Sequence, residues 1–324
     1  MYPSLTLSEE VDDVAESERR LTREILRGLL GRFPRAGDLK PEVIERVDLG
    51  DVVREKVQYQ AEPGEWIPAY LFLPKSRTAP GPAVLCLHQH NGQFHLGKSE
   101  PAGLDGNPEQ FYALELAQRG YVTLTFDFLC FEERRNSAFE GNTGERFEFT
   151  KRLVEGSTLQ AKMSFDAMRS LDYLAARPEV DARRIGCVGH SLGGQQTLFT
   201  TALDERVAAA VSSCGFASCR TIFRDLINHN FSLYVPNLFA HGDVGDILAL
   251  VAPRPFLAAV GNADRIFPFD GIQESIETAR RRYRTLGVDD RVDLVAVDGG
   301  HGFGDYLRER AYAWLDRWLT DDER

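Results

Sequence analysis

Short apolar runs alternate with amphipathic stretches along most of this 324-residue chain. The apolar runs end in turn residues and predict buried strands at 83–87, 121–128, 184–190, 207–214, 255–261 and 292–297. Between them, helical spacing predicts helices at 108–119, 158–177, 195–203 and 271–286. Strands that alternate with helices in this way favour an α/β fold with a mostly parallel twisted sheet of about eight strands, flanked by helices.

The first part of the chain has a different pattern. Apolar residues recur at helical spacing from 8 to 31 and end at Gly31, which predicts an N-terminal helix that packs on the domain or on a second subunit. Segments 51–60 and 66–73, separated by a Pro-Gly turn, predict an antiparallel hairpin at the edge of the sheet. We therefore expect a helical extension over 1–50 and one α/β domain over 51–324.

Two stretches interrupt the alternation. Residues 129–156 are rich in charge, glycine and phenylalanine without a clear period, which predicts an irregular excursion. Residues 215–250 separate two predicted strands and predict a lid insertion with the aromatic residues Phe216, Phe223, Phe231, Tyr234 and Phe239. Packing explains most of these aromatics, while one or two could line a pocket and stack on a sugar or aryl group.

The apolar run at 184–190 leads directly into Gly189-His190-Ser191-Leu192-Gly193, followed by a predicted helix. A serine at such a strand-turn-helix corner is held on a strained turn with its hydroxyl exposed, and the flanking glycines let neighbouring backbone come close. With 28 glycines in the chain, the pentapeptide alone would arise by chance in roughly one chain in ten. Ser191 is a candidate nucleophile only if a base and an acid accompany it.

Two downstream loops offer these partners. Asp264 follows the predicted strand 255–261, and His301 follows the predicted strand 292–297. Because the carboxyl ends of parallel strands meet at one sheet edge, Asp264, His301 and Ser191 should converge there. Taken singly, Asp264 could be an Asx-turn residue and His301 a solvated loop residue. It is much less frequent for both to occur by coincidence in a chain that also has the Ser191 elbow.

Other polar residues lie at the same predicted edge. An oxyanion hole would need two backbone N–H groups, for which Leu192 and His90 are the candidates, while the side chains of His88 and His90 are expected to shape the pocket floor. Asp127 is a weaker rival for the acid, and a pairing with Arg134 or Arg135 is its simpler role. His88, His90 and His95 match no familiar zinc spacing, so we expect neither a metal nor a cofactor.

Four pieces of the sequence resemble the α/β-hydrolase superfamily, in its dienelactone-hydrolase-like and acetyl-xylan-esterase-like branch. They are Leu87-His88-Gln89-His90-Asn91-Gly92, Gly189-His190-Ser191-Leu192-Gly193-Gly194, Ala252-Pro253-Arg254-Pro255 leading to Gly261-Asn262-Ala263-Asp264, and Gly300-His301-Gly302-Phe303. The resemblance spans about 52–319 and implies cofactor-free serine ester hydrolysis, with Ser191 as nucleophile, His301 as base and Asp264 as the orienting acid. Many relatives have His-Gly where this chain has His88-Gln89, so the identity of the second oxyanion donor stays open.

Charge and composition bear on the binding partners, the cellular location and the state of the cysteines. The formal net charge of −11 argues against nucleic acid and anionic membranes, and no apolar run reaches membrane-spanning length. The first residues lack a basic start and an apolar core, so a cytoplasmic protein is expected. Several of the five cysteines fall in apolar runs, which is typical of reduced structural thiols. Self-association into a homo-oligomer stays open.

These observations predict a serine hydrolase of a small or medium carboxylic ester, with an acetylated sugar among the candidate substrates. The same triad could instead cleave an amide or carbon-carbon bond or transfer the acyl group to an acceptor other than water. A hydrolase-shaped protein that only binds a small molecule is the alternative from a different class. The sequence does not separate the enzymatic alternatives, while the presence of all three triad residue types in order argues against the binding protein.

Overall fold

The computed structural model describes residues 21–76, 79–139 and 141–320. Its strands are β1 (Glu42–Asp48), β2 (Val52–Glu62), β3 (Glu65–Pro74), β4 (Gly81–Leu87), β5 (Val122–Phe126), β6 (Val180–His190), β7 (Val207–Ser213), β8 (Phe256–Gly261) and β9 (Val292–Val297). Within the described ranges they form one nine-stranded sheet in the order β1-β2-β3-β5-β4-β6-β7-β8-β9.

The sheet is parallel from β5 to β9 and antiparallel at its other edge. Neighbouring strands pair in parallel from β5 through β4, β6, β7 and β8 to β9. β1 pairs antiparallel with β2, β2 with β3, and β3 with β5. This arrangement confirms the predicted fold class and the predicted hairpin, and β1 accounts for the strand beyond the expected eight.

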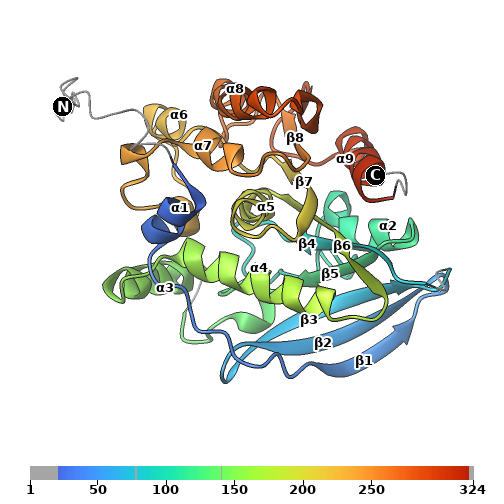
Figure 1. Ribbon diagram of the computed structural model, residues 1–324. Coiled ribbons are helices and arrows are strands. Elements are labelled where there is room, and N and C mark those ends of the chain that lie inside the picture. The colour runs from blue at the N-terminus through green and yellow to red at the C-terminus, as the bar shows by residue number, and fades with distance from the viewer. Residues whose placement is uncertain (1–20, 77–78, 140, 321–324) are drawn as a thin grey trace, which may run out of the picture.

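Helices cover both faces of the sheet (Figure 1). They are α1 (Arg23–Leu30), α2 (Tyr112–Gln118), α3 (Thr143–Val154), α4 (Leu159–Ala175), α5 (Leu192–Leu203), α6 (Cys219–Arg224), α7 (Val244–Ala249), α8 (Phe269–Thr285) and α9 (Asp305–Leu319), with short 3₁₀ turns η1 (Pro108–Gln110), η2 (Glu132–Arg134), η3 (Phe231–Leu233), η4 (Leu238–Ala240) and η5 (Asp289–Arg291). α2 and α9 contribute to the apolar core on one face, and α4, α5, α7 and α8 to the core on the other. No helix in the described ranges is both long enough and apolar enough to cross a membrane.

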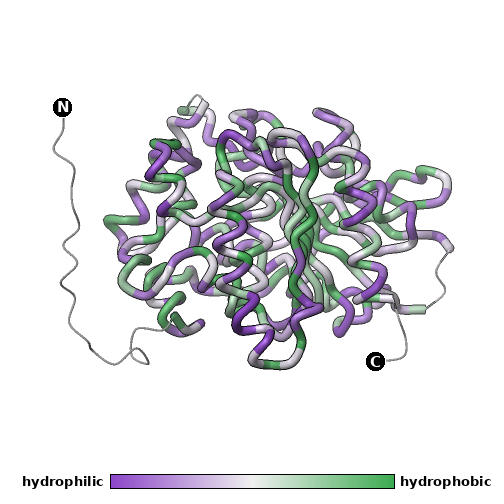
Figure 2. The backbone as a smooth tube through the Cα atoms, turned by 90° about the horizontal axis from the view of Figure 1, so that it is seen from above, coloured by the Kyte–Doolittle hydropathy of each residue, from purple (hydrophilic) through white to green (hydrophobic). Residues whose placement is uncertain are grey.

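The central strands are buried on both faces, which explains their mostly apolar sequences, and the two threonines of β5 are buried with the rest. Every residue of β4 and β5 is buried. Figure 2 shows the central strands as mostly hydrophobic, while the surrounding helices alternate between hydrophilic and hydrophobic residues. Continuous apolar runs are expected wherever helices cover both sides of a parallel sheet. The sheet therefore provides a rigid base for the loops at its carboxyl edge.

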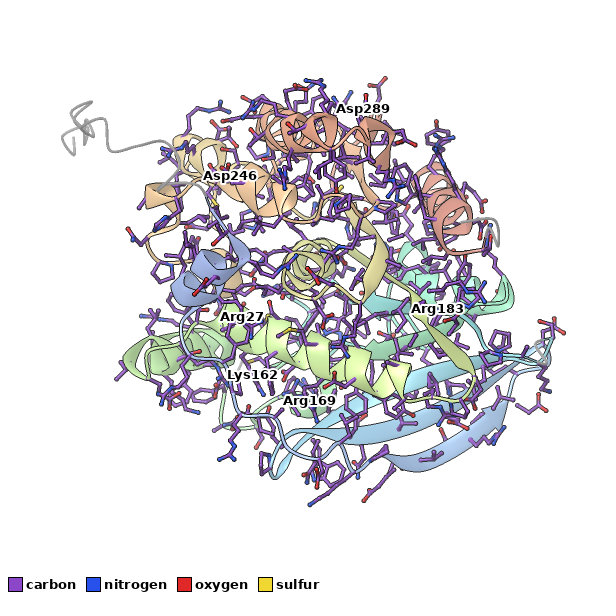
Figure 3. The ribbon with its side chains drawn as sticks, viewed as in Figure 1. Arg27, Lys162, Arg169, Arg183, Asp246 and Asp289 are labelled. Carbon is purple, nitrogen blue, oxygen red and sulfur yellow. The ribbon has the colours of Figure 1, made fainter. Side chains whose placement is uncertain are left out.

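Helix α4 also buries charge. Figure 3 labels Lys162 on this helix, whose Nζ donates to Glu62 Oε1 at 2.6 Å and to Glu65 Oε2 at 2.7 Å, at the turn of the β2–β3 hairpin. Asp166, one helical turn further along, lies 2.9 Å from the same ammonium. A fully buried ammonium is tolerated only with such partners. These ion pairs attach the antiparallel hairpin to the parallel part of the domain.

Two sequence predictions about these regions need correction, and a third can be examined only in part. Residues 42–48 form edge strand β1 rather than part of a helical extension, and residues 143–154 of the expected irregular excursion form helix α3. β1 is exposed almost throughout, and α3 exposes Phe147, Leu153 and Val154, so neither element has the one-sided apolar pattern that sequence reasoning relies on. The predicted N-terminal helix begins at Arg23 in the described chain, and its first part, 8–20, lies outside the described residues.

Candidate active site

Ser191 occupies the sharp corner between β6, which ends at His190, and α5, which begins at Leu192. Its backbone has φ 55° and ψ −120°, in a region that residues with a Cβ seldom adopt. A Cβ on Gly189 would lie 2.4 Å from the backbone of Gly193, and one on Gly193 would lie 1.9 Å from Leu87 O. Both glycines are therefore required for helix α5 to approach β4 and β6, and the backbone geometry matches the predicted elbow. Ser191 is only 7% exposed, however, because the surrounding loops cover the corner, so the predicted exposure of its hydroxyl is wrong.

Asp264 and His301 follow β8 and β9 and form a direct hydrogen bond. His301 Nδ1 lies 2.7 Å from Asp264 Oδ2, and because a carboxylate can only accept, Nδ1 carries the proton. The other carboxylate oxygen accepts the N–H groups of Ile266 at 2.9 Å and Phe267 at 3.3 Å. Asp264 thus makes the Asx-type turn that was its simpler role and contacts the histidine as well.

Burial and hydrogen bonding act in opposite directions on Asp264, whose side chain is fully buried. Burial alone would raise the pKa of this carboxyl, but the hydrogen bond and charge of His301, together with the N–H groups of Ile266 and Phe267, lower that pKa below its ordinary value. The carboxyl therefore remains ionised at neutral pH. Its ionised form selects, for the neutral His301 imidazole, the tautomer that carries its proton on Nδ1.

The His301 loop packs against the residue that precedes Ser191. The rings of His301 and His190 lie 4.7 Å apart, and His190 Nδ1 lies 2.9 Å from Ser213 Oγ. The pKa of His190 is well below its ordinary value because the ring is buried and adjacent to His301. The backbone N–H of Ser191 donates to Ser213 O at 2.8 Å. The loops that carry Ser191, Asp264 and His301 therefore gather at one edge of the sheet.

His88 and His90 follow β4 at the same edge, with both ring nitrogens of each residue occupied. His88 Nδ1 contacts Gln89 O at 2.7 Å and His88 Nε2 accepts the Phe128 N–H at 3.1 Å; burial lowers the pKa of His88 to about 4. His90 Nδ1 accepts the Gly92 N–H at 3.0 Å, so its Nε2 is the donor to Glu145 Oε2 at 2.9 Å. These contacts hold both rings in one orientation.

Asp127 has a different partner from the one predicted. Its carboxylate accepts from Lys98 Nζ at 2.8 Å, whereas Arg134 donates only to its backbone carbonyl. Both Lys98 and Asp127 are completely buried. Burial would lower the pKa of Lys98, but Asp127 and Glu132 hold that pKa above its ordinary value. Asp127 therefore belongs to a buried ion-pair cluster, which leaves Asp264 as the carboxylate that contacts His301.

Neither side-chain cluster with the spacing of metal ligands suits a cation. In the described chain these clusters are Cys214 with Asp264 and His301, and Asp127 with Glu132 and Glu133. The first contains the Asp264–His301 hydrogen bond, and burial raises the pKa of the Cys214 thiol to about 12, so it would not offer a thiolate. In the second, the ammonium of Lys98 already contacts all three carboxylates. The residues present do not fit a metal centre.

Sequence reasoning missed a set of polar contacts made by three consecutive residues of the 215–250 insertion. His229 Nε2 donates to Ile266 O at 2.6 Å, in the loop that carries Asp264. Asn230 Nδ2 donates to Gln195 Oε1 at 3.0 Å, one turn after Ser191 on α5. Phe231 N donates to Glu145 Oε1 at 3.1 Å. Because these partners are distant in sequence and belong to common residue types, no local pattern could have identified them.

Glu145 links this insertion to the loop after β4. It is 1% exposed, with one carboxylate oxygen bound to Phe231 N–H and the other to the His90 ring. The His90 ring also packs against Phe94 and Phe131, with centroids 4.9 and 5.2 Å away. Glu145 therefore holds the backbone around His90, the predicted oxyanion donor, in a fixed position relative to the insertion.

Replacing Glu145 with glutamine is expected to lower turnover of an ester substrate. The amide can still accept one of the two N–H groups, but its NH₂ then faces the other donor, and the His90 loop must shift. We expect kcat to fall by roughly 10- to 100-fold with a smaller change in KM, since a displacement of about 1 Å at a reacting centre has an effect of this size. Steady-state kinetics measure it, with Glu148→Gln on the same helix as the matched control. Unchanged kcat in Glu145→Gln would contradict this role.

Comparison with known proteins agrees with this geometry. A model of the Abhydrolase family matches residues 11–283. The Bacillus subtilis (strain 168) protein YtaP is 32% identical over 308 residues, which cover 94% of this chain and 99% of that protein. Two solved structures are similar in fold at 18% identity. A glucuronoyl esterase from Solibacter usitatus has a TM-score of 0.67, with 92% of each chain covered. Acetyl xylan esterase 1 from Thermoanaerobacterium sp. JW/SL YS485 has a TM-score of 0.64, with 93% of this chain and 100% of that chain covered.

The family match covers far more than half of the chain, and the relative from Bacillus subtilis is similar over almost its full length. The fold of the nine-stranded sheet is similar to that of the two solved esterase structures. The predicted resemblance is thereby confirmed: this chain belongs to the Abhydrolase family and has the α/β-hydrolase fold of acetyl-xylan-esterase-like proteins.

Proposed function

We propose that this protein is a serine hydrolase of small or medium carboxylic esters, among them acetylated sugars, with Ser191, His301 and Asp264 as its catalytic triad. The observation that carries the proposal is the 2.7 Å hydrogen bond between His301 and a fully buried Asp264, in loops that pack beside the strained corner of Ser191. A nucleophile, a base and an orienting acid in this order along the chain are typical of α/β-hydrolases.

In this mechanism His301 Nε2 accepts the proton of Ser191 Oγ as the oxygen attacks the ester carbonyl carbon. The tetrahedral intermediate collapses when the same proton passes to the leaving alkoxide, which departs as the alcohol and leaves an acyl-serine. Water then attacks the acyl carbon, gives a proton to His301 and releases the acid while Ser191 regains its hydrogen. Asp264 stabilises the imidazolium at each step and keeps the ring in the productive tautomer.

Backbone N–H groups of Leu192 and His90 are proposed to bind the oxyanion. Leu192 begins helix α5, so its N–H is one of the groups without an intrahelical acceptor. The loop that carries His90 is held by Glu145, which supports a fixed donor on the other side. Donors that are positioned before the reaction stabilise the developing charge without reorganisation. The proposed mechanism therefore requires neither a metal nor a cofactor.

The relative rates on three substrate classes test the proposal. The enzyme is expected to hydrolyse p-nitrophenyl acetate faster than aminoacyl amides or vinylogous diketones, because ester hydrolysis matches the proposed chemistry. Product release is followed spectrophotometrically or by chromatography at equal substrate concentration. Faster cleavage of the amide or the diketone would replace the ester assignment. Folded wild-type protein that turns over none of the three and does not react with a fluorophosphonate probe would favour a binding protein.

A further inference from the structure

An open groove of about 490 Å³ runs alongside His301. It lies between the turn η1 and the loop that leads from β9 into α9, and its lining includes Val297, Gly300, His301, Gly302, Tyr306 and Glu109. His301 therefore belongs both to the groove and to the proposed triad. A substrate group in this groove would lie next to the residue that returns the proton to the leaving alcohol.

The groove contains two side chains that are free to bind a ligand. Tyr306 is 60% exposed, so its aromatic ring is open to solvent at the start of α9. Within the described residues, the Glu109 carboxylate has neither a hydrogen bond nor an ion pair. Its two oxygens would lie 3.5 and 3.7 Å from Cβ atoms placed on Gly302 and Gly304. The carboxylate thus projects over the glycine-rich His301 loop, where the lack of side chains leaves room for a ligand.

We propose that this groove binds the alcohol part of the substrate, and that this part is a neutral sugar ring. The inference rests on the proposed ester-hydrolase function and specifies the substrate class of the same site. The apolar face of a sugar can pack on an exposed tyrosine ring, and its hydroxyls can donate to the Glu109 carboxylate. A carboxylate suits hydroxyl donors, because its two oxygens only accept hydrogen bonds.

The charge of the groove selects a neutral sugar over an acidic one. Among the described residues, Glu109 has no ionic partner and the groove is lined by neither lysine nor arginine, while Arg308 nearby is already paired with Asp305. A uronate ring in the groove would place like charges near one another, which is unfavourable at short range. We therefore expect esters carried on neutral pentoses or hexoses to bind better than the same esters carried on uronates.

A smaller cavity of about 260 Å³ is a less suitable alternative. It is lined by Arg134, Arg135 and Asn136 among others, and none of Ser191, Asp264 and His301 lines it. A ligand in that cavity would not contact the proposed base. The groove beside His301 is the better location for a leaving group, because the proton must travel from the imidazole to the leaving oxygen.

Tyr306→Ala and Glu109→Gln test the groove with two esters. One is a mono-O-acetylated methyl β-xyloside, which carries the sugar ring, and the other is p-nitrophenyl acetate, which does not. For each variant the ratio of kcat/KM on the sugar ester to kcat/KM on p-nitrophenyl acetate is expected to fall about tenfold. This is the size expected for the loss of charge assistance from one hydrogen bond in Glu109→Gln and for the loss of one aromatic contact in Tyr306→Ala. Tyr306→Phe keeps the ring and should restore most of the ratio. Glu274→Gln on the exposed face of α8 is the matched control and should leave both rates unchanged.

Two results would overturn the sugar subsite. One is an unchanged ratio in both variants, which includes an equal loss on the two esters, and the other is a wild-type preference for the acetylated methyl glucuronoside over the neutral xyloside. Wild-type activity on p-nitrophenyl acetate would persist in each of these cases, so the ester-hydrolase proposal would survive them. A wild-type protein that hydrolyses neither ester would instead refute the ester-hydrolase proposal, and the subsite with it.

Discussion

Ser191→Ala is expected to lower kcat on p-nitrophenyl acetate by about 10⁶-fold, the size of effect seen when the nucleophile of such a triad is removed. The substitution deletes one oxygen from a residue that is only 7% exposed, so the corner itself should keep its shape. The loss comes from the covalent step, because no other group at the corner can form the acyl intermediate. Initial rates at saturating substrate measure the effect.

A fluorophosphonate probe gives an independent readout of the same residue. Wild-type protein should be labelled at Ser191 and the alanine variant should not, with intact mass locating the adduct. Ser275→Ala, at a buried serine of α8 whose hydroxyl donates to Gly271 O, is a matched control that removes a hydroxyl away from the nucleophile. Equal labelling of wild type and Ser191→Ala, with equal melting temperatures, would show that another residue is the nucleophile.

His301→Ala is expected to reduce kcat by a similar number of powers of ten, because Ser191 would lose its base and the leaving group its acid. Residues that act as one unit are strongly non-additive, so the double variant Ser191→Ala/His301→Ala should be hardly slower than either single variant. Turnover close to normal in a folded His301→Ala protein would disprove the base assignment. The comparison uses the same ester assay and thermal melts of all three variants.

Asp264→Asn is expected to lower turnover by an intermediate amount. The amide can donate where the carboxylate only accepts, so it favours the wrong tautomer of His301, and a loss of up to about 10⁴-fold is expected. The loss should be smaller than that of Ser191→Ala. Asp127→Asn is the control, because its carboxylate is bound to Lys98 rather than to His301. If Asp264→Asn kept normal rates, another acid would have to orient the imidazole.

The 215–250 insertion was expected to be a lid. In the structure, part of it is hydrogen-bonded to the elements around the proposed site. Three consecutive residues, 229–231, bind the Asp264 loop, helix α5 and Glu145. Buried hydrogen bonds of this kind are costly to break without replacement. This part of the insertion is therefore held in a fixed position against the loops and the helix that carry the proposed catalytic residues.

The local sequence determined the elements that depend on short-range patterns. The apolar runs specified the parallel strands, because helices cover both faces of the sheet and most positions there are apolar. The glycines around Ser191 specified the elbow, because only residues without a Cβ allow Leu87 and Gly193 to approach. The order of loops after successive parallel strands specified that Asp264 and His301 would meet, because those loops emerge at one edge.

The tertiary structure alone decided which polar groups pair across long sequence separations. Lys98 rather than an arginine neutralises Asp127, and Glu145, 55 residues from His90, holds the predicted oxyanion loop. Strand β1 and helix α3 were missed because neither buries one face. A periodic pattern records only which side of an element is buried, whereas the partner of a charge depends on where distant segments pack. Hence the sequence pattern located the three residues of the proposed triad, and only packing determined which distant residues hold their loops in place.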